Sequence, residues 1–317
     1  MQYIEFIEGE IVFKQASSQP LEVGQIRVKV GAFGINRADL LQRKGHYPPP
    51  AGASHVPGLE AMGEVIEVNN AAALKVGDRV MVLLASDGYS SEIICDHRLA
   101  LKVPESLSNI EAAGFCEVFT TAYQALFEIG KLTAGMKVLI HAGASGVGSA
   151  AIQLAKHSGC EVFTTVGSED KAAYCQKLAA DKCINYKEQD YKTELKGVAI
   201  DVVVDPIGGE YIDKNLSVMA KGGVIIQLAM MGGRMATIDQ AKLLGKRITW
   251  QASTLRDRSI EYKQQLLSGL WQGFGERIAS KQIIVPVYQS ESWQQLEKLH
   301  SIMANNQNLG KLIAVVE

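Results

Sequence analysis

The stretch KVLIHAGASGVGSAAIQLAK, residues 137–156, decides the fold. Its first five residues predict a short buried strand and residues 150–156 predict a helix, with a glycine-rich turn between them. Such a turn carries few side chains, so backbone N–H groups at the start of the helix can face a pyrophosphate. The alternative is a tight turn that binds nothing, and the flanking strand and helix argue against it. The expected dinucleotide contacts of this turn are Gly143, Ser145, Gly146, Val147 and Gly148, with Gly143, Ser145 and Gly148 at the three positions of the dinucleotide fingerprint.

The chain beyond this turn continues to alternate between predicted strands and helices. Strands are predicted at residues 161–166, 183–186, 201–205 and 223–228, a helix at 170–178, and a long polar helix at 256–280. Strands that alternate with helices at this interval predict a parallel, doubly wound α/β sheet. The final residues 311–316 predict a short strand that returns to the first domain.

The end of the second predicted strand bears on the choice of dinucleotide. In NAD-binding proteins an acidic residue about 20 residues past the glycine turn holds the adenosine ribose 2′-hydroxyl. Here Gly167 and Ser168 occupy that place, and Lys171 follows one helical turn later. They leave room and positive charge for a 2′-phosphate, whereas Glu169 and Asp170 argue for a hydroxyl. The balance favours NADPH over NADH.

The first part of the chain has a different pattern. Short alternating runs at residues 25–30, 63–68 and 78–84 predict a β-rich domain up to about residue 103. Residues 47–58 contain four prolines and two glycines, which interrupt ladder pairing and predict a loop. Loops commonly carry functional side chains, so this one is a candidate for the site.

Length and composition exclude several classes of function. A chain of 317 residues predicts two domains, and its formal net charge of −2 with dispersed basic residues indicates no nucleic-acid partner. No apolar run is long enough for a membrane span, and no secretory signal is visible at the start. Five cysteines without paired spacing are typical of reduced thiols in a cytoplasm.

Several separated motifs occur in the order known from one family. They are GINRADLLQRKGHY at 34–47, GLEAMGEV at 58–65, DPIGG at 205–209, MMGG at 230–233 and NLGK at 308–311. With the glycine turn they resemble the zinc-independent medium-chain dehydrogenase/reductases, in particular the quinone oxidoreductases of the zeta-crystallin type and their tumour-suppressor-inducible branch. The resemblance implies a GroES-like catalytic domain from residues 1–118 and 256–317, a Rossmann NADPH-binding domain at 119–255 inserted into it, and a homodimer.

The zinc ligands of related enzymes are replaced in this sequence. Asn36 stands where zinc-bearing relatives have a cysteine, and Leu59 stands where they have a histidine before the glutamate. Cys95 and Cys116 are isolated, so the four-cysteine structural loop is also missing. We therefore expect no metal, which favours reduction of an already electrophilic quinone or conjugated enone over oxidation of an alcohol.

Two residues of the N-terminal part are candidates for catalysis. Tyr47 lies in the loop that the resemblance places over the nicotinamide, and its phenol, with an ordinary pKa of about 10, can donate a hydrogen bond or proton to a developing oxyanion. The alternative is an aromatic that only packs on the ring. Asn36 can orient substrate or the nicotinamide ribose, or can cap a loop. Thr121, expected to begin a helix, contacts the nicotinamide side or caps that helix, and Ser145 contacts phosphate or substrate or has only a steric role.

Further cofactor contacts are expected at later strand ends and in the tail, because ligands of open parallel sheets bind beyond the carboxyl ends of the strands. These residues are Tyr186, Pro206, Ala229, Met230, Met231, Gly232, Ser253, Leu255, Asn308 and Lys311. Tyr186 is alternatively a half-buried strand aromatic. Lys311, and Arg256 next to Leu255, are alternatively solvated surface charges.

The expected function is NADPH-dependent hydride transfer to quinones or α,β-unsaturated carbonyls, without metal or flavin. One alternative is an enoyl-thioester reductase, which would bind the phosphates of a thioester through basic residues. Another is an NADPH-binding redox sensor or structural protein with little catalysis, against which Tyr47 and Asn36 weigh.

Overall fold

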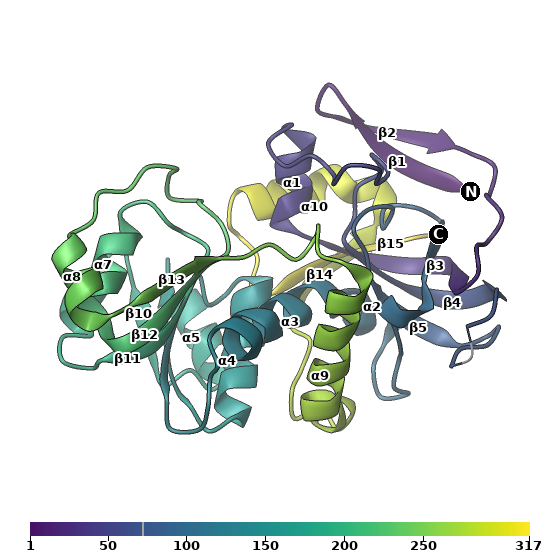
Figure 1. Ribbon diagram of the computed structural model, residues 1–317. Coiled ribbons are helices and arrows are strands. Elements are labelled where there is room, and N and C mark those ends of the chain that lie inside the picture. The colour runs from purple at the N-terminus through teal and green to yellow at the C-terminus, as the bar shows by residue number, and fades with distance from the viewer. Residues whose placement is uncertain (72) are drawn as a thin grey trace. The chain divides into compact units, whose positions relative to one another are not determined.

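The computed structural model describes residues 1–71 and 73–317, which form two compact units. One unit consists of Met1–Thr120 and Leu255–Glu317, and the other of Thr121–Thr254. Each unit has its own sheet (Figure 1). Among the described residues, no helix has the length and apolar content that crossing a membrane requires.

The second unit is built on a six-stranded sheet with the order β10-β9-β8-β11-β12-β13. Every neighbouring pair in this sheet is parallel. The strands are β8 (Lys137–His141), β9 (Glu161–Val166), β10 (Lys182–Asn185), β11 (Ile200–Asp205), β12 (Met219–Gln227) and β13 (Thr249–Ala252). The order reverses between β8 and β11, which is the topological switch point of a doubly wound fold. The predicted Rossmann-type sheet is confirmed.

Helices connect these strands, as parallel pairing requires. They are α4 (Gly146–His157), α5 (Glu169–Lys177), α6 (Tyr191–Glu194), α7 (Tyr211–Val218) and α8 (Gln240–Lys246). α4 packs on β8 and β9, and α5 packs on β9 and β10. Apolar residues of both layers, among them Leu139, Ile184 and Leu216, form the core.

The first unit contains a seven-stranded sheet with the order β14-β15-β3-β4-β5-β7, in which β6 also pairs with β3. The strands are β3 (Gln25–Ile35), β4 (Glu60–Val68), β5 (Arg79–Leu83), β6 (Glu92–Asp96), β7 (Ala100–Lys102), β14 (Val287–Ser292) and β15 (Lys311–Val315), and a separate hairpin joins β1 (Gln2–Ile7) to β2 (Glu10–Gln15). β15 pairs antiparallel with β3, with Leu312 opposite Ile35. The expected return of the C-terminal strand to the first domain is therefore confirmed, as is the GroES-like β-rich domain.

The first unit also contains helices and short 3₁₀ turns. They are α1 (Arg37–Arg43), α2 (Asn109–Ala113), α9 (Ile260–Ala279), α10 (Leu296–Ala304) and the short 3₁₀ turns η1 (His97–Leu99) and η3 (Trp293–Gln295). The predicted helix over 256–280 begins later than expected, because the Ser259 hydroxyl accepts the Tyr262 N–H at 3.2 Å and starts α9 there. Residues 256–259 lie before this cap.

The connection between the units also differs from the prediction. α3 (Cys116–Tyr123) is followed directly by a π-helical turn, η2 (Gln124–Ile129). Thr121 therefore lies inside a helix and does not begin one, so its predicted capping role is wrong. α2 begins at a capping box of Ser108 and Glu111, in which the Glu111 N–H donates to the Ser108 hydroxyl at 3.2 Å.

Candidate functional site

The glycine turn joins β8 to α4 with no room for side chains at two of its positions. A Cβ on Gly143 would overlap the Thr164 hydroxyl of β9 and come within 3.0 Å of the Cys175 sulfur of α5. A Cβ on Gly148 would overlap the Ala142 carbonyl oxygen and lie 2.8 Å from Gly143 Cα. The turn is therefore compact enough for a ligand to approach the backbone itself, as a dinucleotide pyrophosphate does.

Ser145 caps the helix that follows this turn. Its hydroxyl oxygen accepts the Gly148 N–H at 3.0 Å, and its carbonyl accepts the Ser149 N–H at 2.8 Å. The hydroxyl proton of Ser145 stays available to donate, and the first N–H groups of α4, at Gly146 and Val147, have no acceptor within a helix. The donor set fits a phosphate group at the start of α4.

The end of β9 brings together four of the predicted cofactor residues, Gly167, Ser168, Lys171 and Tyr186. The Ser168 hydroxyl accepts the Lys171 N–H at 3.3 Å and caps α5, which leaves its proton to donate. A Cβ on Gly167 would lie 2.5 Å from the Tyr186 hydroxyl, and the Tyr186 side chain is 48% exposed. The Asn185 amide donates to Glu169 at 3.4 Å, which directs that carboxylate towards β10. The small residues, the free hydroxyl and Lys171 fit a 2′-phosphate here.

The loops after β11 and β12 lie against each other. The Met231 N–H donates to the Pro206 carbonyl at 3.3 Å, and the Gly232 N–H donates to the Ile207 carbonyl at 2.7 Å. Ala229 leads into this second loop, and Met230 is 54% exposed. The structure thus groups these predicted residues at the carboxyl edge of the sheet.

Three other predicted contacts of the cofactor lie close to the ends of the second unit. The Thr121 and Ser253 hydroxyl oxygens are buried and make no hydrogen bond to any residue that the structure describes. Leu255, at the start of the returning segment, is 5% exposed. Buried hydroxyls without a partner are uncommon in folded proteins, and a bound ligand would satisfy them.

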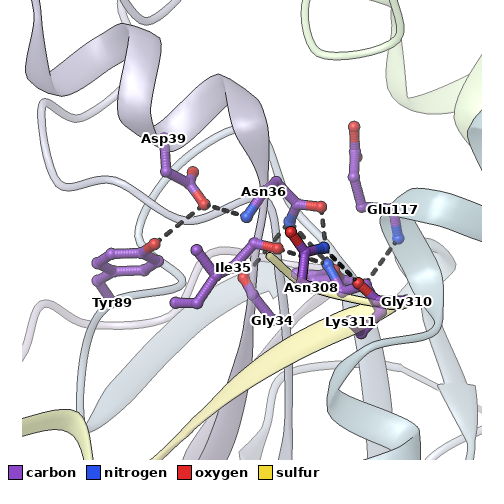
Figure 2. Close-up of polar contacts among 10 residues, drawn as sticks. Gly34, Ile35, Asn36, Asp39, Tyr89, Glu117, Asn308, Gly310 and Lys311 are labelled. Atoms are coloured by element: carbon purple, nitrogen blue, oxygen red, sulfur yellow. Dashed lines mark hydrogen bonds and ion pairs between the residues drawn. The ribbon is translucent and has the colours of Figure 1, made fainter. Parts of the chain in front are cut away.

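A buried charge cluster occupies the first unit, where β3, β4 and β15 meet (Figure 2). Lys311 Nζ donates to Glu60 Oε1 at 2.6 Å, to Asn36 Oδ1 at 2.8 Å and to the Ile35 carbonyl at 2.8 Å. The side chains of Lys311 and Glu60 are 2% and 1% exposed. All three protons of the ammonium are used inside the fold. The surface alternative for Lys311 is therefore wrong, and its contact with a cofactor stays a prediction.

The same cluster fixes the amide of Asn36. Its Nδ2 donates to Glu60 Oε1 at 3.1 Å and to the Gly34 carbonyl at 3.4 Å, while its Oδ1 accepts from Lys311. The backbone of Asn36, not its side chain, starts α1, because its carbonyl accepts the Asp39 N–H at 3.0 Å. Asn36 can therefore offer a ligand the remaining lone pair of Oδ1. In the tail, the Asn308 amide donates to the Gly310 carbonyl at 2.7 Å.

Tyr47 lies under the guanidinium of Arg256, whose Cζ is 5.4 Å from the ring centroid. Arg256 is 3% exposed and donates to the Ala85 carbonyl and the Gln42 side chain, both at 2.7 Å. Its expected place on a solvated face is therefore wrong. Burial and then the negative charge of Glu117 raise the pKa of Tyr47, so the phenol stays protonated and able to donate.

Sequence reasoning missed a hydrogen-bonded chain next to Asn36. Asp39 Oδ2 accepts the Asn36 N–H at 2.7 Å and the Tyr89 hydroxyl at 3.0 Å (Figure 2), and that hydroxyl lies 3.2 Å from His300 Nε2. Burial raises the pKa of Asp39 to about 6 and lowers the pKa of His300 to about 3. The available signal was Asp39 itself, an acid three residues into a helix. Tyr89 and His300 gave none, because their partners are distant in sequence.

The geometry does not fit a zinc ion at the position of the replaced ligands. The Lys311 ammonium already contacts Asn36 and Glu60, and the other oxygen of Glu60 accepts the Glu117 N–H at 2.9 Å. Within residues 1–71 and 73–317, no group of three or more histidine, cysteine, aspartate or glutamate side chains is placed to hold a metal.

Comparisons with known proteins match both units. Residues 22–131 match the alcohol dehydrogenase GroES-like domain family, and residues 146–271 match the zinc-binding dehydrogenase family. The family name refers to zinc, but the donors in this chain do not fit that ion.

Among solved structures, the chain is similar to the JamJ enoyl reductase in its apo form, with 26% identity, a TM-score of 0.88 and coverage of 100% of this chain and 99% of that one. It is also similar to the Escherichia coli quinone oxidoreductase complexed with NADPH, with 27% identity, a TM-score of 0.84 and coverage of 99% and 100%.

Among curated proteins, the mycoketide-CoA synthase of Mycobacterium tuberculosis is 35% identical over 267 residues, which is 82% of this chain and 6% of that protein. The chain spans only a small part, between 4% and 16%, of the polyketide synthases that it matches first. The GroES-like match, the dehydrogenase match and the fold agree, and the chain belongs to the medium-chain dehydrogenase/reductase superfamily of oxidoreductases.

Proposed function

We propose that this protein is an NADPH-dependent enoyl-thioester reductase, which saturates the carbon–carbon double bond next to a thioester carbonyl. The observation that carries the proposal is that the chain's curated relatives include a series of polyketide synthases, while the JamJ enoyl reductase is similar along the whole chain. The sequence analysis expected a quinone reductase first and gave an enoyl-thioester reductase as an alternative. The proposal adopts that alternative. Because the chain is also similar to a quinone oxidoreductase, quinones are the substrates with which turnover of an enoyl thioester should be compared.

The choice of NADPH rests on the end of β9. Gly167 and Ser168 leave space and a donor where an NAD-binding protein has an acid, and Lys171 adds a positive charge. The Escherichia coli relative is complexed with NADPH. When bound, the reduced nicotinamide supplies a hydride to the acceptor.

In the proposed reaction, residues of this chain stabilise the negative charge that develops on the acceptor. Tyr47 presents a protonated phenol, which can donate a hydrogen bond to the carbonyl oxygen as the enolate forms. The Oδ1 of Asn36, held in one orientation by Lys311, is an acceptor for a hydroxyl of the cofactor or substrate. Free cysteines throughout are consistent with a cytoplasmic location, and the family resemblance suggests a homodimer, which light scattering can test.

The function is tested by measuring initial rates of NADPH oxidation with crotonyl thioesters, simple enones and a panel of quinones. We expect the highest kcat/KM with the enoyl thioester, and a lower kcat/KM when NADH replaces NADPH. Faster turnover of quinones than of any thioester would contradict the proposal. Tight binding of NADPH without oxidation by any acceptor would indicate the sensor alternative.

Replacing Tyr47 by phenylalanine is expected to lower kcat by about 10²-fold, because removal of one oxyanion donor has an effect of that order. KM should change little, since the ring and its contact with Arg256 remain. The measurement is steady-state kinetics with the preferred acceptor. Tyr288, 44% exposed on β14, provides the matched control in Tyr288→Phe. Unchanged turnover in Tyr47→Phe would show that Tyr47 only packs.

A further inference from the structure

The side chain of Asn215 joins two strand ends of the second unit. Asn215 lies in α7, and its Nδ2 donates to Asp205 Oδ2 at 3.0 Å, while its Oδ1 lies 2.8 Å from Nε2 of His141. A carboxylate only accepts hydrogen bonds, so the amide nitrogen faces Asp205, the amide oxygen faces His141, and Nε2 carries the proton. Asn215 therefore connects the last residue of β8, His141, to the last residue of β11, Asp205.

Asp205 shapes the loop that follows β11, residues 206–209. Its Oδ1 accepts the N–H groups of Ile207 at 2.7 Å and of Gly208 at 2.9 Å. Gly208 and Gly209 have φ angles of 65° and 56°, in the left-handed region that favours glycine, so the chain bends sharply here. The loop after β12 donates to the Pro206 and Ile207 carbonyls. The Asp205 carboxylate thus holds the 206–209 loop from beneath, and that loop in turn holds the next one.

The other end of these contacts reaches the glycine turn. His141 directly precedes that turn, and its Nδ1 accepts from the Thr165 hydroxyl of β9 at 2.9 Å. The Thr165 carbonyl accepts the Gly143 N–H of the turn at 3.1 Å. Burial lowers the pKa of His141, in agreement with a neutral ring that donates at one nitrogen and accepts at the other. Thr165, His141, Asn215 and Asp205 form one buried set of side chains, which we call the Asn215 network.

The Asn215 network crosses the point where the strand order reverses. Thr165 and His141 belong to β9 and β8, which lead into the candidate 2′-phosphate site and the glycine turn, and Asp205 belongs to β11 on the other side of the switch point. A dinucleotide lies across such a switch point with one nucleotide on each side. We therefore expect the adenosine half of the cofactor over β8 and β9, and the nicotinamide half over the 206–209 loop.

We propose that Asn215 is a positioning residue for NADPH, because its hydrogen bond to Asp205 keeps the 206–209 loop in the conformation that receives the nicotinamide half. The inference rests on the NADPH binding of the proposed function and not on which acceptor is reduced. Asn215 is 0% exposed, so it acts through the loop and does not touch the cofactor. Leucine at this position is similar in size but leaves Asp205 Oδ2 without its donor. A loop that is no longer held must be ordered by the ligand, which lowers affinity.

Isothermal titration calorimetry with two ligands tests this role. One ligand is NADPH, and the other is adenosine 2′,5′-bisphosphate, which carries the 2′-phosphate but lacks the nicotinamide half. We expect Asn215→Leu to weaken NADPH binding by about 10-fold or more and to leave binding of the bisphosphate unchanged. Equal weakening of both ligands would show that the network only supports the fold, and unchanged binding of NADPH would show that it positions nothing, so either result overturns the proposal. Asn215→Ala, which adds no bulk, replaces the leucine variant if that variant does not fold.

An exchange of the amide and the carboxylate provides the rescue. In the double variant Asp205→Asn with Asn215→Asp, the amide at position 205 can donate to the carboxylate at position 215 and still accept the two N–H groups of the 206–209 loop. The carboxylate at position 215 can still accept from His141. We expect the NADPH affinity of this double variant to return close to that of the wild type, and a loss as large as in Asn215→Leu would overturn the proposal.

Tyr191→Phe is the matched control. The Tyr191 hydroxyl donates to the same Oδ1 of Asn215 at 2.9 Å, but Tyr191 lies in α6 and does not contact the 206–209 loop through this bond. Its loss should lower the melting temperature and leave NADPH affinity unchanged. A loss of affinity equal to that of Asn215→Leu would mean that general destabilisation explains both variants, which overturns the proposal.

Turnover separates this inference from the proposed function. If the wild type binds NADPH but reduces no enoyl thioester, the proposed function falls, and the comparison of the two ligands, which needs no acceptor, still decides the role of Asn215. If the wild type does not bind NADPH, both are overturned.

Discussion

Lys311→Met should destabilise the folded protein by about 3–5 kcal/mol, because it removes one partner of a buried ion pair and leaves the charge of Glu60 uncompensated. The two side chains are 2% and 1% exposed, so water cannot replace the ammonium. Asn36 loses the donor to its Oδ1 in the same variant. Equilibrium unfolding in urea, followed by fluorescence, measures the change.

Two further variants separate the charge from the packing. Lys311→Met combined with Glu60→Gln should recover a large part of the loss, because the buried charge is removed with its partner. Lys298→Met breaks an exposed pair with Glu291, whose side chains are 52% and 25% exposed, and should cost no more than about 1 kcal/mol. A single-variant loss as small as that of Lys298→Met would show that the Lys311–Glu60 contact contributes little.

The parallel sheet of the second unit could be predicted because its signals are local. Residues 137–156 contain the strand, the turn and the helix within twenty positions, and the structure has β8 at Lys137–His141 and α4 at Gly146–His157. β13, at Thr249–Ala252, was missed because its four residues are all exposed and show no apolar alternation. The start of α9 was misplaced because Arg256 reads as a helix former, whereas Ser259 supplies the cap.

The acceptor side of the site was harder to predict, since its contacts join residues far apart in the chain. Asn36 and Tyr47 could be proposed from local motifs, but the contact of Lys311 with Glu60 spans 251 positions. Pairing of β15 with β3 brings them together, and only the topology shows that the ammonium faces inward.

Gly148→Ala should weaken NADPH binding by up to about 100-fold, which corresponds to about 2.7 kcal/mol. Two effects of the added methyl group oppose each other. Alanine is a better helix former than glycine by about 1 kcal/mol, and Gly148 lies in the first turn of α4. However, the new Cβ would overlap the Ala142 carbonyl oxygen and lie 2.8 Å from both Cα and O of Gly143.

The backbone contact decides the sign of this change. Overpacking costs about 1–3 kcal/mol, and the turn cannot relieve it by rotating a side chain, because the atoms in contact are main-chain atoms. The turn must open, which moves the Ser145 hydroxyl and the first N–H groups of α4 away from a phosphate. Gly245→Ala on α8 is the matched control, because its Cβ would meet nothing within 4 Å, so it should bind NADPH as the wild type does. Isothermal titration calorimetry measures both, and equal affinities in the two variants would mean that the glycine turn is not the pyrophosphate site.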